Sequence, residues 1–231
     1  MPTISAIVLT FNRADLLGEA IASIEGQTRP PDEILILDDG STDETRALVE
    51  SLGSRVRYVY QENRGLPASR NIAVRTVTGE LIAFLDSDDV WLPGHLEKLL
   101  ARLEQLADPA SCAVMGKLQF VDPQLRPLSQ DEDEGYAPNF SAMLIPRTVW
   151  DRVGPVDETL EFSPDVEWYI RAGELGVPIE RIPDVTLLYR RHPGNMTQDL
   201  AASNRGLAMA LRASMQRRRD QALAADREQP A

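Results

Sequence analysis

The feature that most constrains the fold of this chain is an apolar run that ends abruptly in carboxylates. Residues 81–85 read Leu-Ile-Ala-Phe-Leu, and Asp86, Ser87, Asp88 and Asp89 follow directly. A run of five apolar residues is too short for a helix and predicts a strand buried on both faces, as strands of parallel sheets are. The acidic residues then lie at the carboxyl end of that strand.

Asp86 and Asp88 have the spacing of a site for a divalent cation. In an extended chain, residues two apart point to the same side, so these carboxylates would lie about 7 Å apart. They repel each other unless a positive charge lies between them. A hard cation that keeps part of its water shell and is shared with substrate phosphates, Mg2+ or Mn2+, is the simplest candidate.

Three other interpretations of this acidic segment compete with a metal site. One is a solvated turn after a strand. Another is capping by Asp89 of a helix predicted over 92–105, which is compatible with a metal site. The third is an EF-hand loop from Asp86 to Glu97, but Val90 and Trp91 stand where that loop requires a ligand and its turn glycine.

The composition is that of a soluble globular protein of one domain, or of one domain with a tail. The chain has 231 residues, of which 43% are apolar and 26% are charged. Its net charge of −12 argues against nonspecific binding to nucleic acid. No apolar run approaches the roughly 18 residues of a membrane span and no signal sequence is evident, which predicts a cytoplasmic protein. The single Cys112 excludes an internal disulfide and a thiolate metal site, and its apolar surroundings predict a core position.

The first half of the chain alternates strand and helix patterns. Strands are predicted over 5–9, 33–37, 56–60 and 81–85, each followed by apolar residues at helical spacing. Ser41 and Glu44 have the spacing of a capping box at one of these helix starts. This order predicts a parallel sheet with helices on its faces, in which ligands bind beyond the carboxyl ends of the strands. Those ends carry residues 10–12, 38–41 and 86–89.

The second half mixes strands with acidic and helical segments. Strands are predicted over 112–120, 142–145 and 185–189, and the acidic residues 131–134 predict a solvated loop. Ser163 and Pro164 predict an N-cap and first turn of a helix that runs to Gly176. From Leu200 onward the composition predicts a helix, and the three arginines at 217–219 are expected on its surface.

Together, five segments of the chain resemble family 2 glycosyltransferases, which have a GT-A nucleotide-sugar fold. They are residues 5–12, 34–43, 63–71, 85–89 and 154–158 before Asp165, and the resemblance covers about residues 3–195. It implies an α/β fold with a mixed, mostly parallel central sheet and helices on both faces. The implied domain spans 1–197, with a nucleotide-binding half over 1–105, an acceptor-binding half over 106–197, and a helical tail over 198–231.

The resemblance also assigns roles to residues at the strand ends. Asp39 would accept the N3 proton of a uracil-type base, the loop from Leu9 would hold that base with Arg70 nearby, and Asp86 would face the ribose. The complete nucleotide-binding set is Leu9, Thr10, Phe11, Asn12, Asp39, Arg70, Asp86 and Ser87. The implied metal ligands are Asp88, Asp86 and His192, with the division of roles among Asp86, Asp88 and Asp89 left open.

The stretch around His192 resembles the C-terminal flexible loop of the family. A metal or diphosphate role for His192 competes with that of an exposed loop histidine. Arg190 and Arg191 either offset phosphate charge or are solvated.

Asp165 matches the position of the catalytic base in the family, although Ser163 and Pro164 precede it where Glu-Asp is common. The competing interpretation is an acid that complements the dipole of a helix N-terminus. Glu167 is a second candidate base, but two residues along a helix it points elsewhere.

These expectations combine into a metal-dependent glycosyltransferase that moves one sugar from a nucleotide sugar, most simply a UDP-sugar, to an acceptor hydroxyl with inversion. The Gln-x-x-Arg-Trp motif of processive members is absent from the sequence. The sequence leaves four kinds of acceptor open: a glycan, a lipid carrier, a peptide and a small metabolite.

A sugar-nucleotide nucleotidyltransferase is the alternative function, but it predicts a basic, glycine-rich loop that residues 10–13 do not provide. A non-catalytic sugar-nucleotide-binding protein is the other alternative. A dinucleotide dehydrogenase is disfavoured, since no Gly-x-Gly-x-x-Gly follows the first strand.

Overall fold

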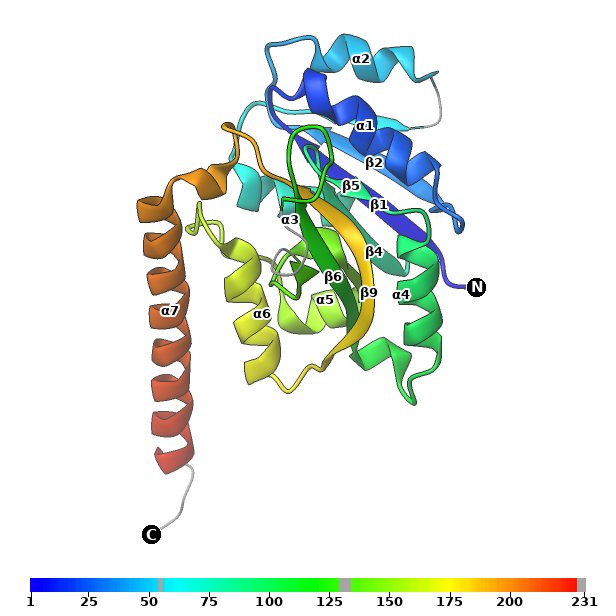
Figure 1. Cartoon of the computed structure of the whole chain (residues 1–231). Coiled ribbons are helices and arrows are strands. Elements are labelled where there is room, and N and C mark those ends of the chain that lie inside the picture. The colour runs from blue at the N-terminus through cyan, green and yellow to red at the C-terminus, as the bar shows by residue number, and fades with distance from the viewer. Residues whose placement is uncertain (54–55, 129–133, 228–231) are drawn as a thin grey trace.

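The computed structural model of the protein describes residues 1–53, 56–128 and 134–227. These residues form one mixed sheet with helices packed against it, and a long helix stands at one side of the molecule (Figure 1). Within these ranges, no helix combines the length and apolar character needed to cross a membrane.

Four parallel strands make up the N-terminal half of the sheet. They are β1 (Ile4–Thr10), β2 (Glu33–Asp38), β3 (Arg57–Tyr60) and β4 (Leu81–Asp86), in the order β3-β2-β1-β4. The strand predicted over 81–85 is therefore confirmed, and residues 81–85 of β4 are buried. In the register of these strands, Thr10 lies beside Asp38 and Leu9 beside Asp86. The carboxyl ends of β1, β2 and β4 are therefore level with one another.

Helices cover both faces of these strands, which explains their nearly continuous apolar sequence. The helices of this half are α1 (Ala14–Glu25), α2 (Thr45–Ser51), α3 (Leu66–Thr76) and α4 (His95–Glu104). Ile4 and Val8 of β1 pack in one core with residues of α1, α2 and α4. Ile7 and Leu9 point to the other face and pack in a second core with residues of α3. This alternation is the period of a strand with two buried faces.

The C-terminal half extends the sheet beyond β4 with strands of both directions. Its strands are β5 (Val90–Trp91), β6 (Ala113–Val121), β7 (Glu134–Gly135), β8 (Met143–Pro146) and β9 (Ile179–Arg190). β8 pairs antiparallel with β4 and β6, β9 runs parallel to β6, β5 pairs antiparallel with β9, and β7 pairs with β6. The mixed sheet predicted from the sequence is confirmed, and Cys112 is buried beside β6 as expected.

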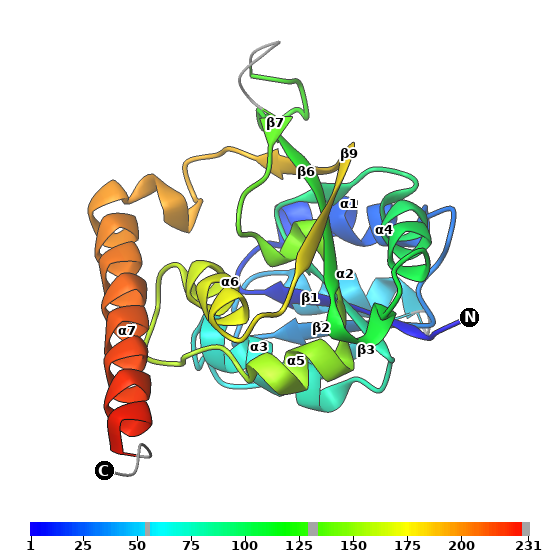
Figure 2. The same ribbon diagram turned by 90° about the horizontal axis from the view of Figure 1, so that it is seen from below.

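Helical segments complete this half of the molecule. They are η2 (Pro109–Ser111), η3 (Phe140–Ala142), α5 (Arg147–Val153), α6 (Pro164–Glu174), η4 (Met196–Gln198) and α7 (Leu200–Arg227). Trp150 of α5 and Trp168 of α6 stack with their ring centroids 5.7 Å apart in the second core. Figure 2 shows α3, α5 and α6 on the same side of the sheet.

The structure corrects the predicted start of α2. Glu44 is the N-cap of this helix and no side chain caps it. The Ser41 hydroxyl instead accepts the backbone N–H of Asn12 at 2.8 Å, and Asp43 accepts the N–H of Thr45 at 3.0 Å. The predicted capping box is wrong because the Ser41 side chain accepts a hydrogen bond from the loop after β1. The spacing of Ser41 and Glu44 in the sequence gives no sign of this distant partner.

Two other predicted helix starts also differ. α4 begins at His95 after Gly94, so Asp89 does not cap it. α6 begins at Pro164 as predicted, but Ser163 has a left-handed backbone with φ of 61° and makes no side-chain cap bond. The predicted acidic loop over 131–134 lies outside the described residues except for Glu134 in β7.

The tail predicted to be helical forms α7, which packs along α6. Its contact side consists of small residues at every fourth position, Ala202, Gly206, Ala210 and Ser214, all buried. A Cβ at Gly206 would lie 2.5 Å from the Phe162 carbonyl oxygen, so this close approach requires glycine.

Arg217 lies on the contact side of α7 rather than on the free surface predicted for it. It pairs with Glu167 at 2.8 Å and with Glu174 at 2.6 Å. These ion pairs join α7 to α6.

Candidate functional site

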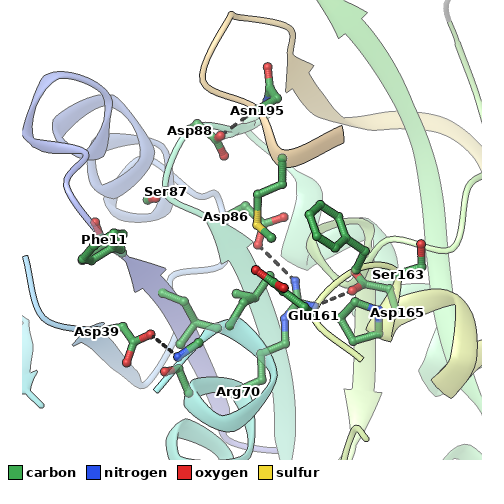
Figure 3. A pocket seen from close by; sticks show the side chains of 18 of the residues that line it. Phe11, Asp39, Arg70, Asp86, Ser87, Asp88, Glu161, Ser163, Asp165 and Asn195 are labelled. Atoms are coloured by element: carbon green, nitrogen blue, oxygen red, sulfur yellow. Dashed lines mark hydrogen bonds and ion pairs between the residues drawn. The ribbon is translucent and has the colours of Figure 1, made fainter. Parts of the chain in front are cut away.

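A cavity of about 750 Å³ lies at the carboxyl ends of β1, β2 and β4 (Figure 3). Its walls include the whole set predicted to bind a nucleotide, Leu9, Thr10, Phe11, Asn12, Asp39, Arg70, Asp86 and Ser87. Asp88 and Asp165 line it too. His192 does not line the cavity, but its Nε2 contacts the Asp88 carboxylate. The parallel register of the three strands is what gathers these distant residues.

The two adjacent acids after β2 have separate environments. Asp38 is fully buried and accepts hydrogen bonds from the Tyr58 hydroxyl at 2.6 Å and the Ser41 N–H at 2.8 Å. This partner and burial raise the pKa of the Tyr58 phenol. Asp39 faces the cavity and accepts the backbone N–H groups of Arg64 and Gly65, both at 2.9 Å. Both acids are buried, so neither lies in a solvated turn.

Arg70 is the cation at the centre of the acidic cavity. Its side chain is only 2% exposed and comes from α3. One guanidinium nitrogen donates to Asp165 and another to Asp86 at 3.3 Å, as Figure 3 shows. The group also lies 5.0 Å from the ring centroid of Phe140. Arg70 therefore links the end of β4 to the start of α6, whereas Asp39 takes its hydrogen bonds from the loop before α3.

The pKa of Asp86 is raised to about 6, because burial disfavours its charged form and the carboxylates of Asp165 and Asp88 add repulsion. The charge of Arg70 lowers the pKa of Asp86 and offsets part of this effect. With such a pKa the Asp86 carboxyl is mostly ionised at neutral pH and takes up a proton about one pH unit below it. Perturbed carboxylates of this kind gather at functional sites.

Asp88 follows Asp86 and faces a loop from the far end of the chain. Its Oδ2 lies 3.0 Å from His192 Nε2 and 3.4 Å from Asn195 Nδ2. The Asp88 side chain is 17% exposed and the His192 side chain 12%. His192 is therefore not a freely exposed loop histidine.

Asp89 and Arg190 hold the loop that carries His192 and Asn195 through buried hydrogen bonds. Asp89 is 1% exposed and accepts the backbone N–H of Arg190 at 2.9 Å. Burial and the charges of Asp88 and Asp86 raise the pKa of Asp89 well above its ordinary value. The Arg190 guanidinium donates to the carbonyls of Asp88 and Pro123 and to a Glu19 carboxylate. The prediction that Arg190 is solvated or offsets phosphate charge is wrong, because its donors hold the acidic segment in place.

Asp165 lies in the first turn of α6 and is held by two donors. One oxygen pairs with Arg70, and the other accepts the Phe140 N–H at 3.1 Å. Glu167, the second candidate base, is 1% exposed, pairs with Arg171 and Arg217, and lies outside the cavity lining. Of the two acids, Asp165 is the one that a ligand in the cavity could reach.

The donor set around Asp88 fits a hard divalent cation. Among the residues that the structure describes, no group of three or more His, Cys, Asp or Glu side chains has metal-binding geometry. Asp88 and His192 nevertheless bring a carboxylate oxygen and an imidazole nitrogen within 3.0 Å of each other. Mg2+ in particular takes only one or two protein carboxylates and completes its shell with water and substrate phosphates.

Several cavity residues were not singled out from the sequence. They are Asn63, Gly65, Leu66, Ser69, Pro138, Asn139, Glu161, Phe162, Tyr189, Asn195, Met196 and Ser203, among others. Asn63, Gly65 and Ser69 stood in a segment with family resemblance, and Tyr189 and Asn195 in the stretch around His192. Pro138, Asn139, Glu161, Phe162, Met196 and Ser203 carry no motif, because they reach the cavity from segments whose course the local pattern does not determine.

Comparison with known proteins agrees with this geometry. A chain from Rickettsia typhi described as an uncharacterised glycosyltransferase is 28% identical over 184 residues, which are 73% of this chain and 58% of that protein. The present chain thus spans little more than half of that relative. S. aureus TarS, solved in complex with UDP-GlcNAc, superposes with a TM-score of 0.72 at 21% identity over 85% of this chain and 61% of TarS. The mannosyltransferase PcManGT from Pyrobaculum calidifontis, solved with GDP-Man and Mn2+, gives a TM-score of 0.72 at 20% identity over 93% of this chain and 64% of that one.

Both solved structures share the fold, which confirms the predicted GT-A architecture. The family model described as glycosyl transferase family 2 matches residues 5–144, more than half of the chain. The chain therefore belongs to glycosyl transferase family 2.

Proposed function

We propose that this protein transfers one sugar from a nucleotide sugar to an acceptor hydroxyl, with inversion at the sugar carbon. One observation carries the proposal: a single cavity collects Asp39, Asp86, Asp88 and Asp165 from three separate segments of the chain. Its volume of about 750 Å³ is within the range of sites that enclose small ligands.

The nucleoside would occupy the end of the cavity formed by β1 and β2. Asp39 is held by the Gln61 side chain and two backbone N–H groups, and the free lone pair of its Oδ2 can accept a hydrogen bond from an N–H on the edge of a base. Phe11 is 45% exposed at this wall and offers an aromatic surface to the base. Asp86 would accept a ribose hydroxyl. A uracil nucleotide is the simplest match because its N3–H is a donor.

Asp165 would act as the general base. Arg70 and the Phe140 N–H fix its carboxylate, so it needs no reorganisation when an acceptor hydroxyl arrives. The hydroxyl proton passes to Asp165 as the oxygen forms a bond to the sugar carbon. The bond from that carbon to the diphosphate breaks with its electron pair on the diphosphate, and attack from the opposite side inverts the centre.

Asp88, Asp86 and His192 would hold Mg2+ or Mn2+ at the diphosphate end. The cation supplies Lewis-acid stabilisation of the leaving phosphate charge. The solved complexes of TarS with UDP-GlcNAc and of PcManGT with GDP-Man and Mn2+ support a nucleotide-sugar donor and a divalent ion. Uracil is proposed because the family resemblance implies it, and guanine, which also presents N–H donors to a carboxylate, is separated from it by the donor panel below.

The test is a thermal-shift experiment followed by a donor panel. UDP with Mn2+ is expected to raise the melting temperature more than either alone, because a ligand that binds only the folded state stabilises it. Slow hydrolysis of UDP-, GDP- and dTDP-sugars, with and without Mn2+, then identifies the donor without knowledge of the acceptor. No shift with any of the three diphosphates at millimolar concentration would contradict the proposal.

A further inference from the structure

A stripe of exposed apolar side chains runs along α7 beside the side that packs on α6. Leu200 is 72% exposed, Leu207 42%, Leu211 49% and Met215 63%. Their spacing of seven, four and four residues places them along one face of the helix. At 1.5 Å per residue the stripe is about 22 Å long. A stripe of this length is unusual on a free surface, where apolar side chains are ordinarily scattered singly.

Arginines run beside this stripe. Residues 200–219 contain five arginines and no Asp or Glu, although the whole chain has a net charge of −12. Arg205, Arg212 and Arg219 are exposed and recur at a spacing of seven, so they form a basic line next to the apolar one. We call these three arginines, with Leu200, Leu207, Leu211 and Met215, the outer face of α7.

The outer face begins beside the mouth of the cavity. Met196, which precedes α7, lines the cavity and is 45% exposed, and Ser203 in the first turn of α7 lines it as well. Figures 1 and 2 both show α7 at the edge of the molecule, with α6 between it and the strands of the sheet.

We propose that the outer face of α7 docks on the surface of an anionic lipid bilayer. Apolar side chains in a row, flanked by arginines, are the pattern of helices that lie in the plane of a membrane interface. The leucines and Met215 would enter the acyl boundary, and the arginines would meet lipid phosphates. The interaction is peripheral, since the helix lies on the bilayer.

The charge pattern favours a bilayer over a second copy of this chain. In a symmetric dimer the same face meets itself, which would bring Arg205, Arg212 and Arg219 toward the same three arginines of the second copy, with no Asp or Glu among residues 200–219 to offset them. A bilayer rich in anionic lipid presents one sign of charge over its whole surface.

Docking does not depend on the proposed transfer reaction. If both hold, the cavity mouth next to Met196 would lie near the lipid headgroups, and an acceptor carried in the membrane would reach Asp165 from that side. This consequence rests on the proposed function, whereas the binding itself is tested without substrate.

The experiment is co-sedimentation of the full chain with vesicles of phosphatidylcholine alone and of an equal mixture with phosphatidylglycerol. Binding to the mixed vesicles only, weakened by salt, is expected. The combined variant Arg205→Gln, Arg212→Gln and Arg219→Gln should lose roughly 100-fold in affinity, since each basic residue near the surface contributes about fivefold. The combined variant Leu207→Ser, Leu211→Ser and Met215→Ser should lose at least about tenfold.

Met209→Ser is the matched control. Met209 is 43% exposed on the same helix but lies off the stripe, so its replacement should leave vesicle binding unchanged. Circular dichroism and melting of each variant show whether α7 still folds. The UDP shift of the melting temperature, measured on the same samples, should persist in all of them, which separates failure of docking from failure of the proposed function.

Three outcomes would overturn the proposal. They are absence of binding to the mixed vesicles, equal binding of the parent and both combined variants, and a dimer in sedimentation equilibrium that the serine variant dissociates. The last result would assign the outer face to contact between copies of the chain.

Discussion

Replacement of Asp165 by asparagine separates the chemical role of this residue from its structural one. The carboxylate accepts from Arg70 on one oxygen and from the Phe140 N–H at 3.1 Å on the other. Asparagine keeps one acceptor oxygen and turns the second position into a donor. One of the two donors then loses its partner and faces another N–H group.

The stability cost follows from these contacts. Arg70 is only 2% exposed and Asp165 15%, so water does not readily replace the lost bond. A hydrogen bond to a charged group contributes about 1.5–3 kcal/mol. For a chain of this size each kcal/mol shifts the melting temperature by about 2–4 °C, so we expect a fall of about 3–12 °C. The loss of a general base should in addition slow transfer by roughly 100-fold to 10,000-fold.

Glu167→Gln is a matched control for this variant. Glu167 lies on the same helix, is 1% exposed, and pairs with Arg171 at 2.9 Å and Arg217 at 2.8 Å, but does not line the cavity. Its amide should therefore lower the melting temperature by a similar amount. Since Glu167 touches no ligand, transfer per folded molecule should stay within a few fold of the parent.

The assay is UDP release, with and without acceptor, at a temperature where circular dichroism shows each variant fully folded. Asp165→Asn should keep the UDP shift of the melting temperature and part of the slow donor hydrolysis, because water needs less positioning than an acceptor. Transfer within a few fold of the parent would refute the assignment of Asp165 as base and leave it a structural acid. A loss in Glu167→Gln as large as in Asp165→Asn would show that the rate reports the integrity of α6.

Asp88→Asn tests the metal, and His95→Phe tests a buried histidine of the core. Asp88→Asn should abolish nearly all turnover and the effect of Mn2+ on donor hydrolysis. The melting temperature without ligands should stay close to that of the parent. An Asp88→Asn variant that keeps Mn2+-dependent activity would contradict the role of Asp88. His95 is fully buried against Trp91, with ring centroids 4.4 Å apart, and burial lowers its pKa to about 3 from an ordinary 6.5. Between about pH 6.5 and pH 3, His95 is protonated in the unfolded chain but neutral in the folded chain. The free energy of unfolding therefore falls as the pH is lowered through this range. Between pH 7 and pH 5 the parent should lose about 2 kcal/mol of unfolding free energy more than His95→Phe, measured by urea denaturation, and equal losses would refute the buried neutral state.

The sequence was sufficient for the half of the fold where local pattern and tertiary environment agree. Residues 81–85, and residues 4–9 apart from Ser5, are apolar on both sides because helices cover both faces of β1 and β4. The acids that follow them stand at the same edge because Leu9 pairs with Asp86 and Thr10 with Asp38. Strand pattern and parallel order therefore predicted where the cavity forms.

The roles of adjacent acids could not be predicted in the same way. Asp38 and Asp39 look alike in the sequence, but one bonds Tyr58 in the interior and the other faces the cavity. Successive residues of a strand point to opposite faces, so their environments diverge once the sheet is covered. Which side becomes the cavity depends on the course of the loop before α3.

Partners distant in the sequence were the other limit. Arg70 meets Asp165 across 95 positions, and His192 meets Asp88 across 104. Neither pairing has a local signature, because each depends on how the C-terminal half of the sheet joins β4. The antiparallel insertion of β8 between β4 and β6 sets that geometry.

Arg190 illustrates how such a distant contact changes the meaning of a residue. In the sequence it is one of two adjacent arginines near a histidine, which suggests a phosphate or solvent. In the fold its neighbour Arg191 lies 4.1 Å from the ring centroid of Phe120, while Arg190 is 1% exposed and donates to the Asp88 carbonyl at 2.9 Å. A buried guanidinium whose three nitrogens each donate a hydrogen bond fixes the backbone that it contacts. Arg190 therefore holds the acidic segment after β4 in the geometry from which Asp88 faces His192.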